Sequence, residues 1–191
     1  TAISLSHLMP NFDDYRVTIL DVGEGQCILL QDGNQNYLVD CGGEHSKTVA
    51  EEASQLLLSQ GITKLNGVFL THYDADHANG LPYLLATIGV EKLYLPDTPD
   101  TGGVRSTLES RYGNKIVWVT EKGQLLTEGF LVTAFPAQKE AKGNESSLCL
   151  LFQRENCDIL ITGDRSDIGE QALLQDAELP KLELLIVGHH G

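Results

Sequence analysis

The densest group of potential metal ligands in the sequence is the segment HYDADH, which runs from His72 to His77. It follows directly on the apolar residues 67–71, which are expected to form a strand. Alternate residues that leave a strand on a loop can turn toward one point, so we expect His72, Asp74 and Asp76 to converge and His77 to close the cluster. Because imidazoles suit zinc and manganese and carboxylates favour harder ions, the pattern predicts a divalent metal site without fixing the metal.

Two later segments have the same form, an apolar run that ends in a potential ligand. The first reads ILITGD and ends at Asp164, and the second reads LLIVGHH and ends in the pair His189 and His190. Either segment alone is a weak signal, because an aspartate after a strand is often the N-cap of the next helix, and a histidine there is often a surface residue. Three apolar runs that each end in ligands favour one shared site, which would hold one or two ions of zinc or manganese.

The apolar pattern of the chain places these ligands at the ends of strands. Short strands are expected at residues 17–22, 27–31, 37–41, 67–71, 92–95, 116–119, 130–135, 147–152, 158–162 and 182–187. Helices are expected at residues 46–60, with Gly61 as the C-cap, and at 81–88, 104–112 and 168–175. Residues 137–145 are expected to form a mobile loop. This order favours an α/β (α+β) fold in which two packed sheets are covered by helices.

The composition is that of one folded domain with a strongly acidic surface. The 191 residues are 41% hydrophobic, enough for a single core, and the formal net charge of −14 repels polyanions unless metal ions or a basic patch offset it. No apolar run is long enough to cross a membrane, and the four cysteines, which show no CxxC spacing, are expected to be buried small hydrophobes. We expect residues 1–191 to be one domain excised from a longer protein and lacking its C-terminal end.

A set of motifs, in order along the chain, carries a specific resemblance. The motifs are DVGEGQC (residues 21–27), LVDCGG (38–43), THYDADHANGL (71–81), NESSL (144–148), ITGD (161–164) and GHHG (188–191). The chain resembles the metallo-β-lactamase superfamily, and within it the soluble domain of the ComEC competence family, from about residue 16 to its last residue. The resemblance implies an αββα sandwich of two mixed sheets, with a metal centre at one edge between the sheets.

The resemblance also implies roles for the candidate ligands. His72 and Asp74 match one metal site, with Asp74 where the superfamily usually has a histidine. Asp76 and His77 match the second site, and Asp164 matches the carboxylate that bridges the two.

The remaining ligand is either His189 or His190, and His189 is preferred because the superfamily commonly places its ligand straight after the glycine. No histidine lies between His77 and His189, so the middle histidine of the superfamily is missing, as is usual in the ComEC-like branch. Asn144 or Ser146 is expected to stand near that gap, where it would support the metal site.

Two positions near the start of the chain have open roles. Gln26 stands where the ComEC-like pattern has an aspartate. Asp40 is expected either to orient a ligand histidine or only to cap a turn.

The expected chemistry is hydrolysis by metal-bound hydroxide, because a divalent ion lowers the pKa of bound water toward neutrality. Asp76 is expected to orient or deprotonate this water, and His190 or solvent to protonate the leaving group. The resemblance implies a phosphodiesterase or nuclease that acts on single-stranded DNA during competence-related DNA uptake. Two alternatives stay open: a hydrolase of a small ester, lactone or phosphoester, which the acidic charge favours, and a non-catalytic metal-binding module of a DNA-translocation protein.

The same resemblance implies a location. The parent protein would carry membrane-spanning segments outside this fragment, with the domain on the extracytoplasmic side of a bacterial membrane. A stand-alone enzyme of this type would instead be cytoplasmic.

Overall fold

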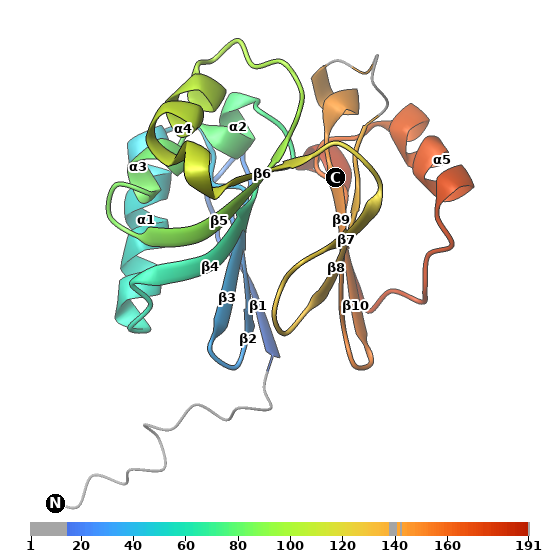
Figure 1. The fold of residues 1–191 in the computed structure, drawn as a ribbon, viewed down its shortest axis with the longest axis horizontal. Coiled ribbons are helices and arrows are strands. Elements are labelled where there is room, and N and C mark those ends of the chain that lie inside the picture. Colours follow the sequence, from blue (N-terminus) through green and yellow to red (C-terminus); the bar gives the residue numbers. More distant parts are fainter. Residues whose placement is uncertain (1–14, 138–140, 142, 191) are drawn as a thin grey trace, which may run out of the picture.

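The computed structural model describes residues 15–137, 141 and 143–190, apart from the side chains of Asp176 and His190. Two β-sheets pack face to face, and helices cover the outer face of each sheet (Figure 1). This is the αββα layering that the sequence predicted. Within the part of the chain that the structure describes, no helix combines the length and the apolar character needed to cross a membrane.

The first sheet contains the strands of the first half of the chain in their sequence order. They are β1 (Tyr15–Ile19), β2 (Ile28–Asp32), β3 (Gln35–Val39), β4 (Lys64–Phe69), β5 (Gly89–Pro96) and β6 (Ile116–Val119). The first three form an antiparallel meander, whereas β3 to β6 run parallel. Parallel neighbours need crossover connections. The crossovers contain α1 (Ser46–Ser59), α2 (Ala75–Ala78), α3 (Leu81–Leu84) and α4 (Val104–Tyr112).

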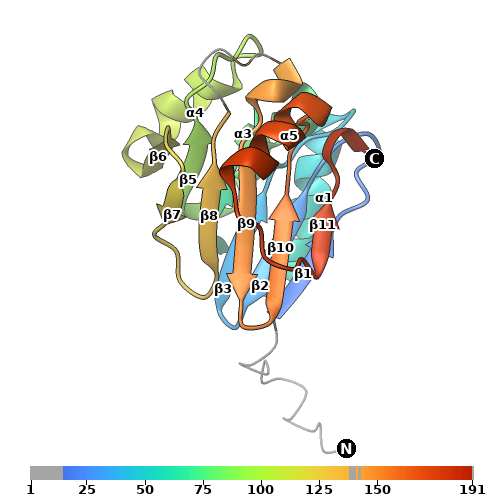
Figure 2. The same ribbon diagram turned by 90° about the vertical axis from the view of Figure 1, so that its right-hand side faces the viewer.

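The second sheet contains the strands of the second half of the chain. Its order is β11 (Leu184–Ile186), β10 (Cys157–Ile161), β9 (Cys149–Arg154), β8 (Leu131–Phe135) and β7 (Gly123–Leu125). Only the β10–β11 pair is parallel, and α5 (Asp167–Asp176) connects those two strands across the outer face of the sheet (Figure 2).

The alternation of side chains along the strands builds two main cores. In β2, Ile28 and Leu30 face the second sheet, whereas Leu29 faces the helices. Between the sheets, Phe69 meets the edge of Phe152 with ring centroids 5.2 Å apart. A smaller cluster lies under α5. The apolar contacts therefore hold the two sheets together as one sandwich.

A charged pair joins the sheets at the end where the β2–β3 and β9–β10 turns lie (Figure 1). Arg154 Nε donates to the carboxylate of Asp32 at 2.8 Å, and the Asp32 side chain is buried. The opposite end of the sandwich, where β4 and β10 reach their carboxyl ends, holds the predicted ligands.

Most expected elements are present, and the differences have local causes. The helix 104–112 and the strand 116–119 match the expectation residue for residue. The C-cap of α1 is Gln60 and not Gly61, which follows it with a positive φ of 77°. The expectation of a plain loop at 72–77 was partly wrong, because the N–H groups of His77 and Ala78 donate to Asp74 O and start the helical turn α2.

Other boundaries moved by a few residues. The helix expected at 81–88 ends at Leu84, and β4 ends at Phe69, two residues before the expected end. The short strand β7 was not expected. Of the loop expected at 137–145, residues 138–140 and 142 lie outside the described residues, and Gly143–Ser146 form a 3-10 turn.

Candidate metal centre

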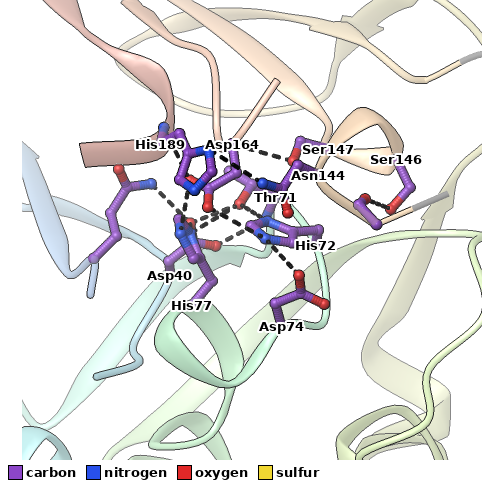
Figure 3. Close-up of polar contacts among 12 residues, drawn as sticks. Asp40, Thr71, His72, Asp74, His77, Asn144, Ser146, Ser147, Asp164 and His189 are labelled. Atoms are coloured by element: carbon purple, nitrogen blue, oxygen red, sulfur yellow. Dashed lines mark hydrogen bonds and ion pairs between the residues drawn. The ribbon is translucent and has the colours of Figure 1, made fainter. Parts of the chain in front are cut away.

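Three buried side chains meet between the sheets, at the edge of the sandwich that holds α2 (Figure 3). Ligand atoms of His72, His77 and Asp164 all lie within 4.8 Å of one another. His77 Nε2 is 3.0 Å from Asp164 Oδ1, and His72 Nε2 is 3.9 Å from Asp164 Oδ2. Side chains that are far apart in the sequence therefore point at one small volume.

The two sheets supply these side chains from opposite sides. His72 and His77 follow β4, and the turn of α2 brings the second ring back toward the first. Asp164 follows β10 after Gly163, which has a φ of 60°. A Cβ on Gly163 would lie 2.8 Å from Ser147 Cβ and 3.0 Å from Thr71 Cβ, so glycine permits both the left-handed turn and the close approach.

Asp40 lies fully buried beside the histidines and accepts four hydrogen bonds. Thr71 donates its N–H to Oδ1 and its hydroxyl to Oδ2, each at 2.7 Å. Gln26 Nε2 and His77 Nδ1 each lie 2.8 Å from Oδ2. Three of these contacts share Oδ2 and one is made to Oδ1, so most of the acceptor capacity of the carboxylate is used. Its geometry is that of a group that orients a ligand histidine.

The hydrogen-bond pattern assigns which nitrogen of each ring carries a hydrogen. Because the carboxylate of Asp40 only accepts, His77 Nδ1 carries a hydrogen directed at it. The hydroxyl hydrogen of Thr71 is donated to Asp40, so the 3.1 Å contact between Thr71 Oγ1 and His72 Nδ1 requires a hydrogen on His72 Nδ1. Both rings therefore turn Nε2 toward Asp164.

The arrangement fits a divalent cation. His72 Nε2 is buried and has no hydrogen-bond partner among the described residues, which is unfavourable unless a ligand binds there. Burial and the neighbouring His77 lower the pKa of His72, so its Nε2 keeps a lone pair at neutral pH. Imidazole nitrogens and a carboxylate oxygen are ordinary zinc ligands.

His77 is held differently from His72. Burial acts to lower the pKa of His77, but its hydrogen bonds with Asp164 and Asp40 outweigh this effect and raise the pKa to about 10. Without metal, the ring is therefore an imidazolium between two carboxylates at neutral pH. A cation would replace the proton on His77 Nε2.

Asp74 and His189 lie at the rim of the group of three. Asp74 Oδ2 is 3.7 Å from His72 Nε2, and the Asp74 side chain is 54% exposed. The His189 N–H donates to Asp164 Oδ1 at 3.2 Å, and His189 Nδ1 is 3.3 Å from Asn144 Nδ2. The edge of the site, next to the three central ligands, is therefore formed by Asp74, His189 and Asn144.

The remaining predicted residues are not part of the central group of three ligands. Asp76 is half-buried in the first turn of α2, and its carboxylate is not among the ligand atoms of the central group. The Ser146 hydroxyl donates to Gly143 O at 2.6 Å, within the 3-10 turn. The side chain of His190 lies outside the described residues. The roles of Asp76 and His190 stay predictions.

The alternative that Asp164 caps the following helix is wrong. Helix α5 begins after Ser166, whose Oγ accepts from the N–H of Ile168 at 3.4 Å. Asp164 therefore precedes the cap, and its carboxylate is directed at His77.

Sequence reasoning missed two supporting residues, Thr71 and Ser147. Thr71 links Asp40 to His72, and Ser147 Oγ accepts the N–H of Asp164 at 3.1 Å. Each lies next to a recognised motif, but a hydroxyl beside a motif is too common in proteins to be singled out without the contacts.

A pocket of about 360 Å³ opens beside Asp74. Its walls include Tyr73, Pro99, Asp100 and Thr101, and none of the described residues that line it is lysine or arginine. The space next to the candidate metal centre is therefore acidic and partly apolar.

Comparison with known proteins agrees with this geometry. A model of the metallo-beta-lactamase superfamily matches residues 20–191. ComE operon protein 3 of Bacillus subtilis (strain 168) is 27% identical over 92% of this chain and 25% of its own length. Competence protein ComA of Neisseria gonorrhoeae is 26% identical over 92% of this chain and 23% of its own length. The chain thus spans about a quarter of the length of these curated relatives.

Solved structures show the same fold at low sequence identity. The metallo-beta-lactamase SMB-1 bound to 2-mercaptoethanesulfonate has a TM-score of 0.66 at 14% identity, over 93% of this chain and 78% of that one. The metallo-beta-lactamase fold protein YhfI from Bacillus subtilis has a TM-score of 0.56 at 18% identity, over 91% of this chain and 70% of that one. On the match to the family model and the site geometry, the chain belongs to the metallo-beta-lactamase superfamily.

Proposed function

We propose that this chain is the metal-dependent phosphodiesterase domain of a competence protein and that it cleaves single-stranded DNA. One observation carries the proposal: His72, His77 and Asp164 converge in a buried group, with both Nε2 atoms turned toward the carboxylate. The two competence relatives support a role in DNA uptake. We further propose that the domain lies on the extracytoplasmic side of the membrane as part of a longer, membrane-anchored protein.

Each group of the site has a task in this proposal. A divalent cation, zinc or manganese, supplies Lewis-acid chemistry when bound, because it polarises a phosphoryl oxygen and makes water more acidic. His72, His77 and Asp164 would hold one cation, and Asp74 and His189 at the rim would extend the ligand set for this ion or a second one.

The remaining groups handle water and protons. Asp76 orients or deprotonates the attacking water, and His190 or solvent protonates the leaving group. Asn144, which contacts His189, keeps that ring at the rim of the site. Asp40 and Thr71 keep the two central rings in the orientation that binds metal.

Charge is the main difficulty for a DNA substrate. The net charge of −14 and the acidic pocket beside Asp74 repel a polyanion, so DNA must depend on the cation for attraction. The same pocket favours a second candidate, a hydrolase of a small ester, lactone or phosphoester whose body would occupy the 360 Å³ space.

The test is a cleavage assay on the purified chain with added Mn²⁺ or Zn²⁺. Fluorescent single-stranded DNA and bis(p-nitrophenyl) phosphate are incubated with the wild type and with Asp164→Asn. Asp167→Asn is the matched control, because it makes the same change three residues away at an exposed position. The proposal expects metal-dependent DNA cleavage that Asp164→Asn and a chelator abolish and that Asp167→Asn leaves unchanged.

The other outcomes separate the rival functions. Turnover of the small phosphodiester without any cleavage of DNA would replace the proposal with the small-substrate hydrolase. Tight metal binding without turnover of either substrate would replace it with the non-catalytic module. DNA cleavage that survives Asp164→Asn would identify a contaminating nuclease.

A further inference from the structure

Gln26 connects two parts of the metal centre. Its backbone N–H donates to Asp76 O at 2.9 Å, and its Nε2 donates to Asp40 Oδ2 at 2.8 Å. We infer that Gln26 is a positioning residue: it fixes the Asp40 carboxylate, which in turn holds the Nδ1 hydrogen of His77 and turns Nε2 of that ring toward Asp164.

The hydrogen bonds on Asp40 show why a further donor matters. Three of its four donors come from residues 71–77, two from Thr71 and one from His77. Gln26 is the fourth, and it comes from the loop before β2. Without it, the Asp40 side chain would be held only by residues 71–77, the stretch that carries the histidine it orients. Gln26 therefore ties the carboxylate to a separate part of the fold.

The loop that carries Gln26 packs closely against the backbone of neighbouring segments. A Cβ on Gly25 would lie 2.6 Å from Gly43 Cα and 2.9 Å from Asp76 O, so the backbone of this loop packs directly on its neighbours. The Gln26 N–H bond to Asp76 O adds a fixed link to α2. The amide of Gln26 is thus presented to Asp40 from a rigid support, as a positioning group requires.

The chemistry of an amide explains the residue type. Asp40 is an acceptor, and an amide nitrogen donates at every pH. A carboxylate at position 26, which the ComEC-like pattern would have there, sets a second acceptor against Asp40 unless one of the two is protonated. In this chain the orientation of His77 therefore does not depend on a proton shared between residues 26 and 40.

The inference rests on the metal centre of the proposed function but not on its substrate, so the first experiment measures zinc affinity. Competition with a chromophoric chelator is applied to the wild type, Gln26→Met, Gln26→Glu and the control Gln124→Met, which changes an exposed glutamine of β7. Loss of a residue that orients a ligand typically weakens metal binding about 10- to 100-fold. We expect at least tenfold weaker binding in both Gln26 variants and no change in Gln124→Met. Unchanged zinc affinity in Gln26→Met would overturn the inference.

Two further readouts distinguish positioning from general stability. In the Asp40→Asn background, Gln26→Met should have no additional effect on zinc affinity, because the pathway through Asp40 is already broken; an equal factor in both backgrounds would refute the inference. NMR of the metal-free chain should show a slowly exchanging Nδ1 hydrogen of His77 in the wild type and fast exchange in Gln26→Met.

The NMR result keeps the inference testable if Asp40→Asn does not fold. A protected Nδ1 hydrogen in Gln26→Met, equal to the wild type, would overturn it. If the wild type bound no zinc, the proposed function itself would fail, whereas the NMR comparison would still decide whether Gln26 acts on His77.

Discussion

Thr71 Oγ1 lies 3.1 Å from His72 Nδ1, and the same hydroxyl donates to Asp40 Oδ2 at 2.7 Å. One side chain therefore links the ring of His72 to the carboxylate that orients His77. The two central histidines do not have independent supports. A change at Thr71 reaches both of them.

Thr71→Val keeps the shape of the side chain and removes the hydroxyl. We expect metal affinity to fall about 10- to 100-fold, because His72 loses the acceptor for its Nδ1 hydrogen. The free energy of unfolding of the metal-free protein should fall by about 1–3 kcal/mol, because Asp40 loses a buried donor. Isothermal titration with Zn²⁺ and chemical denaturation measure the two effects. Thr133→Val on β8 is the control, and equal zinc affinity in Thr71→Val and the wild type would contradict the assignment of His72.

Zinc binding should release a proton from His77. The pKa of this ring in the metal-free protein is raised from 6.5 to about 10, so the ring is protonated at pH 7 and the cation must displace that proton. Apparent zinc affinity should therefore rise about tenfold per pH unit above neutrality and level off near pH 10. Calorimetric titrations in buffers with different ionisation enthalpies count the released protons. Binding at pH 7 without proton release would show that His77 is not a ligand.

The same pKa shift predicts the sign of a stability effect. Because the folded-state pKa of His77 lies above its ordinary value of 6.5, its contribution to the stability of the metal-free protein is complete below pH 6.5. It is lost as the pH rises toward about 10. Denaturant midpoints of the chelated protein at pH 6, 8 and 10 should fall in that order, and the His77→Gln variant should lack this trend.

Gly42→Ala should be strongly destabilising. A Cβ at this position would overlap the backbone of Asp76 and His77, so α2 and its ligand would have to move. We expect a loss of about 1–3 kcal/mol or more, as for other overpacked sites, together with weaker metal binding. Gly113→Ala is the control, because a Cβ there meets nothing within 4 Å. Thermal unfolding with and without zinc compares the two, and an equal response would show that the close approach at Gly42 is unimportant.

The thiols should be unreactive in the folded protein. All four cysteines are buried, and burial raises the pKa of Cys149 to about 12, so almost no thiolate forms at pH 8. A chromogenic disulfide reagent should react slowly with the native chain. After denaturation it should react with four thiols. Fast labelling of the native chain would show that the fold opens often.

The sequence predicted the layered fold because apolar periodicity is a local pattern, whereas the meeting of the motifs was inferred from their repeated form and from the family resemblance. Apolar runs that end in His72 and Asp164 mark the carboxyl ends of β4 and β10, and such ends lie at one edge of a sandwich. The pattern could not show that the N–H groups of His77 and Ala78 bond to Asp74 O and wind residues 75–78 into a turn. That turn moves Asp76 away from the loop position that alternation had suggested.

The sequence also could not predict which distant segments contact one another. The family pattern marks Asp40, but its four donors come from residues 26, 71 and 77, and only the packed chain shows that they meet. The ambiguity over Asp164 was resolved by the observation that Ser166 caps α5. A cap and a ligand look alike in sequence, because both are aspartates that follow a strand.

The ion pair between Arg154 and Asp32 fastens the two sheets at one end, and a cation held by His72, His77 and Asp164 would fasten them at the other. The ion pair needs no bound ligand, whereas the link through the metal is lost when the cation is removed. Withdrawal of the metal should therefore loosen the sandwich mainly around the candidate metal centre, because the apolar core between the sheets and the hydrogen bond from Leu148 N–H to Thr71 O still join them.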